Sequence, residues 1–494
     1  MSSPTAQQLN EATGLEVYEA SVSQADGGFV FLARRGLEKL IGCWGEPCLP
    51  NAQKAGELDG KCVCTGPTDH ANAEAVRKAL PWTAPRCVGL ARSVGLGDRL
   101  GVATPGHIRA VRGTGLAAVL AQQSIREMSR TQRTPEEVMD CATWGVLQEG
   151  FRDGFGADAD HLQRPEDIDR TAAAGFTMFT IDPGAHVDNA ADTDSREALA
   201  EKVGHLDMTT LETRPADLTS RYVGRSFDLD GVRISFDEET LLRAAAKYGQ
   251  AVAHTVTMYR HLVSAVRGEF ELEISVDETD SPTSPAEHYF FANELKRLGV
   301  KWVSLAPRFI GRFEKGVDYI GDLDAFRASF AEHVAVMKAL GPYKLSIHSG
   351  SDKFSIYPIV AELAGQYVHL KTAGTSYLEA IRAIAGIDPE LFREILAFAH
   401  QRYQQDKATY HVSADPAKVP RPEDLADAEL AGVLDSFDGR QLLHVTFGSV
   451  LTARNDDGSS RFRQRILTAL KQDEEAHYAA LARHLGRHVA PFAE

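Results

Sequence analysis

The stretch 270–307, "FELEISVDETDSPTSPAEHYFFANELKRLGVKWVSLAP", decides the fold. Short apolar runs typical of buried strands stand at its two ends, and the segment between them has helical periodicity that ends at Gly299. Two strands joined through a helix form a parallel crossover unit, because the helix returns the chain across the sheet. The same alternation continues from about residue 86 onward. The sequence therefore predicts an α/β protein built on parallel strands.

Several further apolar runs are candidate strands of the same sheet. We predict strands at residues 100–104, 176–181, 270–276, 301–305, 344–347, 368–370 and 442–446, and the run "FVFL" at residues 29–32 could supply an eighth. Eight strands alternating with helices form a (β/α)8 TIM-type barrel. We expect the barrel, with insertions and carboxyl-terminal helices, to span residues 86–494, after an irregular amino-terminal extension over residues 1–85 that could contribute its first strand.

The parity of the strand residues indicates which side chains face the barrel interior. Along residues 271–277 the apolar side chains alternate with polar ones, because successive side chains of a strand point to opposite faces. The outer face of a parallel barrel packs on helices and must be apolar. We therefore expect the polar set to point into the barrel and toward its mouth: Glu271, Glu273, Ser275 and Asp277.

Composition limits the class of protein. The chain has 494 residues, of which 43% are hydrophobic and 25% charged, and a formal net charge of -16. This charge gives no basic surface for a nucleic acid. The sequence shows neither a signal peptide nor a run of about 18 apolar residues. We expect a cytoplasmic protein with no nucleic-acid or membrane partner, and the sequence leaves a homo-oligomer open.

Four of the six cysteines lie close together in the amino-terminal extension. Cys43, Cys48, Cys62 and Cys64 have the spacings C-x4-C and C-x-C. Structural zinc sites usually combine two C-x2-C pairs. We therefore interpret these four cysteines as free thiols rather than as a metal site.

Histidines recur at the ends of the predicted strands and indicate a metal site. His348, His369 and His444 each end an apolar run with the same parity, and Asp277 and Glu278 end another. Mixed imidazole and carboxylate ligands favour Zn, Mn, Fe, Co or Ni over Ca. We predict a divalent metal ion bound by His348, His369 and either Asp277 or Glu278, with His444 as a substitute ligand.

The other strand-end charges suit a polar, anionic substrate. Arg99, Arg308, Lys353 and Lys371 are the cations at these positions, and arginine binds carboxylates with two hydrogen bonds. The glycines of "GLGDRLG" at residues 95–101 do not have the spacing of a dinucleotide-binding loop, so no nicotinamide cofactor is expected. Neither a phosphate-binding G-x4-G-K-[ST] loop nor a G-x-S-x-G serine elbow is present in the sequence.

Several long strings of the chain resemble the bacterial tagaturonate epimerase family. They include "GLGDRLGVATPGHIRA" (95–110), "QQSIREMSRTQRTPEEVMD" (122–140), "IHSGSDKFSIYPIV" (347–360), "HLKTAGTSYLEAIRAIA" (369–385) and "HVSAD" (411–415). The resemblance implies a metal-dependent (β/α)8 barrel that interconverts D-tagaturonate and D-fructuronate in hexuronate catabolism, and some relatives act on neutral ketohexoses at carbon 4. The cysteine-rich segment before Arg86 has no counterpart in that pattern.

The implied reaction suggests roles for the polar residues. The inverted carbon is β to the ketone, so enolisation does not assist removal of its proton. Retro-aldol cleavage and re-formation of the bond, or transient oxidation by a nicotinamide, remain as routes. We predict that Asp182 and Lys371 transfer protons. We also predict four substrate-binding residues, with Arg308 and Arg99 on the carboxylate and Ser349 and Asp352 on hydroxyls.

Three alternative functions stay open at this point. A neutral ketohexose 4-epimerase and a class II metal-dependent aldolase would use the same residues. A non-catalytic sugar-acid sensor would bind the sugar without turnover.

Overall fold

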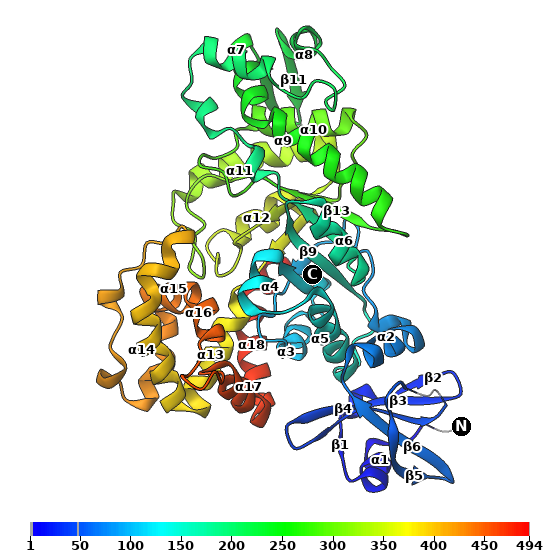
Figure 1. Ribbon diagram of the computed structural model, residues 1–494. Helices are drawn as coiled ribbons and strands as arrows, with labels where there is room; N and C mark the ends of the chain where they lie inside the picture. Colours follow the sequence, from blue (N-terminus) through cyan, green and yellow to red (C-terminus); the bar gives the residue numbers. More distant parts are fainter. Residues whose placement is uncertain (1–2, 47–48, 494) are drawn as a thin grey trace.

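The computed structural model describes residues 3–46 and 49–493. Eight parallel strands form a closed barrel at the centre of the molecule (Figure 1), which confirms the predicted fold class. In the spatial order of the barrel, the strands are β10 (Met178–Ile181), β13 (Glu271–Ser275), β14 (Ser304–Ala306), β15 (Lys344–Ile347), β16 (Val368–Lys371), β7 (Ser93–Gly95), β8 (Ala117–Ser124) and β9 (Phe155–Leu162).

Five of the predicted strands are in the barrel and two are not. The runs at 176–181, 270–276, 301–305, 344–347 and 368–370 correspond to β10, β13, β14, β15 and β16. Residues 100–103 instead form a loop before helix α3 (Thr104–Val111), where the Asp98 carboxylate accepts hydrogen bonds from three backbone N–H groups. Residues 442–446 lie mainly in helix α15 (Phe437–Val445), which is buried along most of its length. A short apolar run does not distinguish a buried strand from a buried helix.

The "FVFL" run belongs to a separate sheet rather than to the barrel. The amino-terminal sheet is antiparallel and consists of β1 (Glu16–Val17), β2 (Ser23–Ala25), β3 (Gly28–Arg35), β4 (Glu38–Gly45), β5 (Gln53–Leu58) and β6 (Lys61–Pro67). It lies at the lower end of the molecule in Figure 1, with helix α1 (Ala6–Thr13) on it. An ion pair of 2.7 Å between Lys39 and Glu474 joins this sheet to the last long helix.

Helices cover the barrel on its outer side. These helices are α3, α5 (Pro135–Gln148), α6 (Pro165–Ala173), α9 (Glu238–Ala265), α10 (Pro285–Arg297), α11 (Leu323–Leu340), α12 (Tyr357–Ala364), α13 (Thr375–Ile387) and α18 (Glu474–Val489), whereas α4 (Ile125–Thr131) lies at the carboxyl end of β8. Helix α2 (His70–Ala79) connects the amino-terminal sheet to the barrel. Capping boxes such as the one between Ser284 and Glu287 fix several helix starts.

Two additions extend the barrel. Between β10 and α9, the chain forms α7 (Arg196–Gly204), α8 (Pro215–Tyr222) and the hairpin of β11 (Arg225–Leu229) and β12 (Val232–Phe236), seen at the top of Figure 1. After α13, the helices α14 (Pro389–Asp406), α15, α16 (Phe447–Thr452) and α17 (Arg463–Gln472) pack together around a second apolar core. Among the described residues, no helix has the length and apolar character needed to cross a membrane.

The polar face of β13 points into the barrel as the parity predicts. Leu272 and Ile274 belong to the large apolar core between barrel and helices. Glu273 and Ser275 are fully buried on the other face, where Glu273 contacts Lys371 of β16 and His348, which follows β15. The barrel interior therefore contains a layer of charged groups just below its mouth.

Candidate active site

Two adjacent cavities open at the carboxyl ends of the barrel strands. The larger has a volume of about 300 Å³ and the smaller about 60 Å³. Both are lined by Arg126, Asp277, Lys315, His348, Ser349 and Tyr410. Active sites of parallel barrels lie at this face, because the loops that follow the strands meet there. These cavities therefore form the candidate active site.

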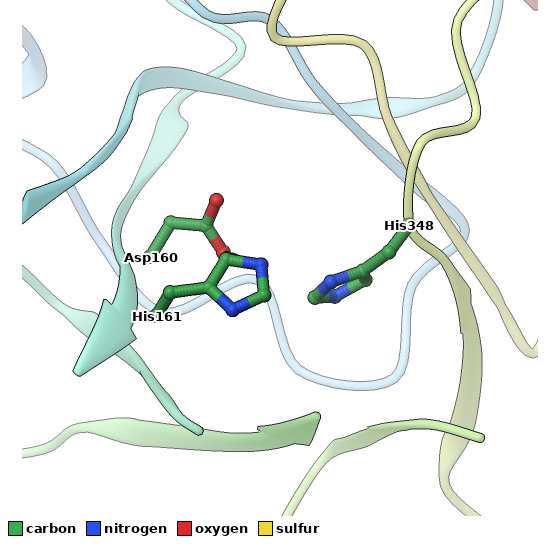
Figure 2. Close-up of side chains that lie close together, drawn as sticks. All are labelled: Asp160, His161 and His348. Atoms are coloured by element: carbon green, nitrogen blue, oxygen red, sulfur yellow. Dashed lines mark ion pairs between the residues drawn. The ribbon is translucent and has the colours of Figure 1, made fainter. Parts of the chain in front are cut away.

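His348, His161 and Asp160 form the centre of this site. His348 follows β15 and the other two residues are on β9, and Figure 2 shows their side chains pointing toward one another. One ligand atom from each lies within 4.8 Å of the others, and the two imidazole rings are 5.1 Å apart, edge to face. His161 has a left-handed backbone with φ 54°, which is uncommon outside glycine and is found at functional sites.

Carboxylates on β13 and just after it surround His348. Its Nε2 lies 2.7 Å from Oε1 of Glu273, and its Nδ1 lies 3.3 Å from Oδ1 of Asp277. Burial and the charge of Lys371 disfavour the protonated ring, but Asp277 and Glu273 outweigh them and raise the pKa of His348 to about 8. The carboxylates therefore favour a positive charge at this position.

His161 has a similar environment on the opposite side. Asp182 accepts from Nδ1 of His161 at 3.3 Å and from the Gln163 amide at 2.9 Å. Burial disfavours the charged ring, but Asp160 and Asp182 outweigh it and raise the pKa of His161 to about 10. Asp182, predicted to transfer protons, does not line either cavity and instead orients His161.

Lys371 is buried below the two histidines. Its Nζ lies 2.7 Å from Asp158, 2.7 Å from Asp160 and 2.6 Å from Glu273. Burial disfavours the ammonium, but these three carboxylates raise the pKa of Lys371 well above its usual range. Proton transfer by Lys371 stays a prediction, and its three short ion pairs favour the role of a fixed cation instead.

The donor set fits a divalent transition-metal ion. Five carboxylates approach Lys371 and the two histidines: Asp158, Asp160, Asp182, Glu273 and Asp277. The single positive charge of Lys371 balances only part of this negative charge. The remaining negative charge raises the pKa values of His161 and His348. Two imidazoles and a carboxylate are ligands that Zn, Mn, Fe, Co and Ni accept. His161, His348 and Asp160 are the residues that could hold such an ion.

Two of the predicted ligands contact other residues instead. His369 pairs in register with Ser346, two residues before His348, so it lies deeper in the barrel and its Nδ1 contacts Ser93 at 2.9 Å. Burial lowers the pKa of His369 to about 3. Glu278 lines the larger cavity but forms an ion pair of 2.9 Å with Arg126. The structure therefore brings His348 and Asp277 into direct contact, whereas His369 contacts Ser93 and Glu278 pairs with Arg126.

His444, the predicted substitute ligand, comes from helix α15 rather than from a strand. It is buried and lines the smaller cavity next to Gly374, where an added Cβ would lie only 2.0 Å from the His444 ring. His444 therefore packs closely against the loop after β16 and forms part of the wall of the site.

The two predicted carboxylate-binding arginines differ in their environments. Arg99 is buried, donates to Glu127 at 2.6 and 2.8 Å, and stacks on the Phe447 ring at 3.7 Å. Arg308 is half-buried and lines the larger cavity. Among the described residues, no carboxylate forms an ion pair with Arg308. Arg308 is therefore the better placed of the two to receive a substrate carboxylate.

Ser349 and Asp352 belong to the same loop but face different surroundings. Ser349 lines both cavities and accepts from Nζ of Lys315 at 2.5 Å. Asp352 lines neither cavity and is bound by Arg440 at 2.9 Å and His484 at 2.6 Å. The predicted hydroxyl contact of Asp352 stays a prediction, and the buried partners of its carboxylate favour a structural role instead.

Comparisons with known proteins agree with this architecture. A family model described as tagaturonate epimerase matches residues 18–492. The chain is also 43% identical over 478 residues to the tagaturonate/fructuronate epimerase of Thermotoga maritima, which covers 96% of each chain. The chain belongs to the tagaturonate epimerase family. This confirms the resemblance noted in the sequence, and the chain is a carbohydrate epimerase, an enzyme of the isomerase class.

Solved structures of the tagaturonate epimerase family have the same fold. The native structure of the fructuronate-tagaturonate epimerase UxaE from Cohnella laeviribosi matches with a TM-score of 0.91 at 37% identity, covering 99% of each chain. A structure of that protein with two glycerol molecules matches with a TM-score of 0.92 at 36% identity, again covering 99% of each chain.

Several residues of this family member's site were not predicted from the sequence. They are Asp158, Asp160 and His161 on β9, Gln122 and Arg126 near the end of β8, and Lys315 and Tyr410 from loops. The segment "FGADADHL" is rich in Gly, Ala and Asp, which are depleted in strands. The alternation of Asp158 and Asp160 before His161 is the one signal that could have located them.

Proposed function

We propose that this chain interconverts D-tagaturonate and D-fructuronate, using a divalent metal ion and the cleavage and re-formation of a carbon–carbon bond. The observation that carries the proposal is the larger cavity, whose wall contains His348 and four cations: Arg126, Arg308, Arg312 and Lys315. Binding of a sugar acid requires a group that interacts with its ketone and a cation that binds its carboxylate. The names of the relatives in Thermotoga and Cohnella support the substrate pair.

The metal belongs at His161, His348 and Asp160 in this proposal. When bound there, a divalent ion would polarise the ketone oxygen and stabilise negative charge next to it. Asp182 accepts a hydrogen bond from His161 and so fixes the orientation of that ring. The charge of Lys371 outweighs burial at Asp160 and Glu273 and lowers the pKa of both carboxyls, which keeps their oxygen donors available.

Asp277 is the proposed base. Its carboxylate lines both cavities, and its side chain is 17% exposed, so it can meet a substrate hydroxyl. Taking the proton from the hydroxyl on the inverted carbon allows the bond to the neighbouring carbon to break. After the aldehyde fragment has turned over, the same carboxylate returns the proton to the new hydroxyl.

Arg308 is the proposed contact for the substrate carboxylate. The other cations of the larger cavity already have partners, since Arg126 pairs with Glu278 and Lys315 donates to Ser349. A bidentate contact from Arg308 would place the sugar acid with its carboxylate at the rim of the cavity and its ketone toward His348. A cytoplasmic location is also part of this proposal, because the implied pathway breaks down hexuronates taken up by the cell.

One experiment separates this function from its alternatives. Metal-stripped protein is supplied with individual divalent ions, incubated with tagaturonate or with tagatose, and followed by NMR. We expect fructuronate to form only when an ion is added. Accumulation of a three-carbon aldehyde would indicate an aldolase, and binding without turnover would indicate a sensor. A rate that depends on added NAD would contradict the cleavage route.

A further inference from the structure

Lys353 is a buried lysine that the proposed reaction does not use. Its side chain is fully buried, lines neither cavity, and forms no ion pair with a carboxylate among the described residues. Its Nζ instead donates to three backbone carbonyls, those of Glu314 at 2.8 Å, Val317 at 2.5 Å and Ser351 at 3.0 Å. Burying an ammonium without a carboxylate in contact is costly, so these three hydrogen bonds must offset that cost.

The three carbonyls belong to two different loops. Residues 307–322 follow β14 and carry Glu314 and Val317, whereas residues 348–356 follow β15 and carry Ser351. All three residues are buried, and a buried carbonyl needs a hydrogen-bond donor. An ammonium has three N–H donors, so Lys353 can supply one to each carbonyl. Lys353 therefore joins the two loops at this point.

Both loops reach the candidate active site. Lys315 lies between Glu314 and Val317, lines both cavities, and donates to Ser349 at 2.5 Å. Ser349 precedes Ser351 by two residues. The carbonyls that Lys353 binds are thus within two residues of the contact between Lys315 and Ser349. A shift of either loop would change this wall of the cavities.

The loop after β15 is also fixed by other groups. The Tyr357 hydroxyl on α12 accepts from the backbone N–H of Lys353 at 3.0 Å and donates to the Gly350 carbonyl at 2.5 Å. In the loop after β14, Arg440 donates to the Gly316 carbonyl at 2.8 Å. Removing the Lys353 ammonium should therefore loosen the loop after β14 without releasing it.

We propose that Lys353 is a positioning residue for the epimerase reaction. From the loop after β15 it fixes the loop after β14, and with it the place of the Lys315 ammonium in the cavity wall. The proposed metal ligands and the proposed base are not in the loop after β14, so Lys353 acts on substrate binding rather than on the chemical step. The proposal rests on the proposed function only for the sugar that is assayed, D-tagaturonate.

The protonation of Lys353 gives a readout that belongs to this residue. Burial lowers the pKa of Lys353 to about 7, although the charge of Asp352 opposes this shift. The other charged groups that face Lys353 are Lys315, Asp318 and Glu314. Below this pKa the ammonium has a donor for each carbonyl, whereas the neutral amine has only two for three. The link between the loops is therefore complete at low pH and weakens as the pH rises through the pKa of Lys353.

Lys353→Met removes the donors and keeps much of the side-chain volume. Its KM for tagaturonate should rise at least about threefold, while kcat stays within about twofold and bound metal is unchanged. A purely structural role would lower the apparent kcat at unchanged KM, because fewer molecules would be folded. The ratio of the variant's KM to that of the unmodified protein should fall toward one as the pH rises above about 7.

Two further variants complete the experiment. Ser355→Ala removes a half-buried hydroxyl that donates to Asp318 at 2.9 Å, which is a second link between the same loops. It should raise KM by a smaller factor, and it decides the question if Lys353→Met does not fold. Lys296→Met is the matched control, since Lys296 donates to the Leu340 carbonyl at 2.9 Å and lines neither cavity. Its KM and kcat should stay within about twofold of the unmodified protein.

Three results would overturn the proposal. They are an unchanged KM in folded Lys353→Met, a loss of activity that follows a loss of bound metal, and a KM ratio that does not depend on pH. If only Ser355→Ala folds, an unchanged KM in that variant has the same meaning. An unmodified protein that converts tagatose but not tagaturonate would contradict the proposed substrate, and the same KM comparison would then be made with tagatose.

Discussion

Replacing Arg308 by methionine tests how the site distinguishes a sugar acid from a neutral sugar. The guanidinium of Arg308 lines the larger cavity and forms no ion pair with the described carboxylates, so a substrate carboxylate would be its partner. Methionine keeps much of the side-chain volume and removes the charge. The metal centre and the proposed base are unchanged by this substitution, so its effect should depend on the substrate.

The expected magnitude follows from the strength of one charge-assisted contact. Hydrogen bonds to charged groups contribute about 1.5–3 kcal/mol, and every ~1.4 kcal/mol changes a rate or affinity about tenfold. Arg308→Met should therefore lower kcat/KM for tagaturonate by roughly one to two decades. Activity on tagatose, which has no carboxylate, should stay within about twofold of the unmodified protein.

The control for this prediction is Arg312→Met. Arg312 lines the same cavity, but its side chain is 61% exposed and lies 3.6 Å from Glu314. We expect Arg312→Met to change kcat/KM for either sugar by less than about threefold, since exposed charges contribute little. Steady-state kinetics of both variants with both sugars measure these changes in kcat/KM. Equal losses on tagaturonate and tagatose in Arg308→Met would refute the reasoning and make Arg308 a support of the site, with Arg99 the next candidate.

Three further predictions address the metal, the base and the fold. His348→Asn should lower bound metal at least about tenfold and abolish turnover, and metal analysis that finds unchanged content would remove His348 from the ligand set. Asp277→Asn should lower kcat about a hundredfold or more with metal content unchanged, whereas loss of metal would make Asp277 a ligand instead of the base. Asp352→Asn should lower the melting temperature, because removing one partner of a buried ion pair costs about 3–5 kcal/mol. Burial raises the pKa of Asp352, but Arg440 and His484 outweigh it and hold this pKa well below its usual range. The free energy of unfolding that ionised Asp352 adds is therefore present at neutral pH. It is lost as the pH falls through the folded-state pKa of Asp352. The difference in melting temperature between the unmodified protein and Asp352→Asn should therefore narrow in strong acid, and a constant difference would contradict this account.

The barrel could be predicted from the sequence because most of its strands have a pattern that is visible in a few neighbouring residues. The strands β10, β13, β14, β15 and β16 are short apolar runs followed by polar residues, and their parity placed Glu273 and Ser275 inside. Strand β9 escaped prediction because "FGADADHL" has the composition of a loop. Its β-structure comes from pairing with β8 and β10, which is a tertiary effect.

A site residue could be predicted only where the strand that carries it had been predicted. His348 and Asp277 were located because they follow predicted strands, but His161 and Asp160 are on β9, which with β7 and β8 is one of the three barrel strands that were missed. The partners of Asp352 lie 88 and 132 residues away in the chain. Pairings over such distances depend on how the helices pack, and no local pattern reports them.

Helix α18, the last long helix, holds the loop that carries Ser349 in place. The backbone N–H of Asp352 donates to Nε2 of His488 at 2.9 Å, and its carboxylate contacts His484, so helix α18 holds one wall of the cavity from behind. A ribosome must therefore complete residue 488 before this wall can take its final shape. Truncated chains that lack α18 would contain all eight barrel strands, but they would lack the support for this wall of the cavity. We expect such fragments to be inactive from the start, so the cell gains no partial activity from an incomplete chain.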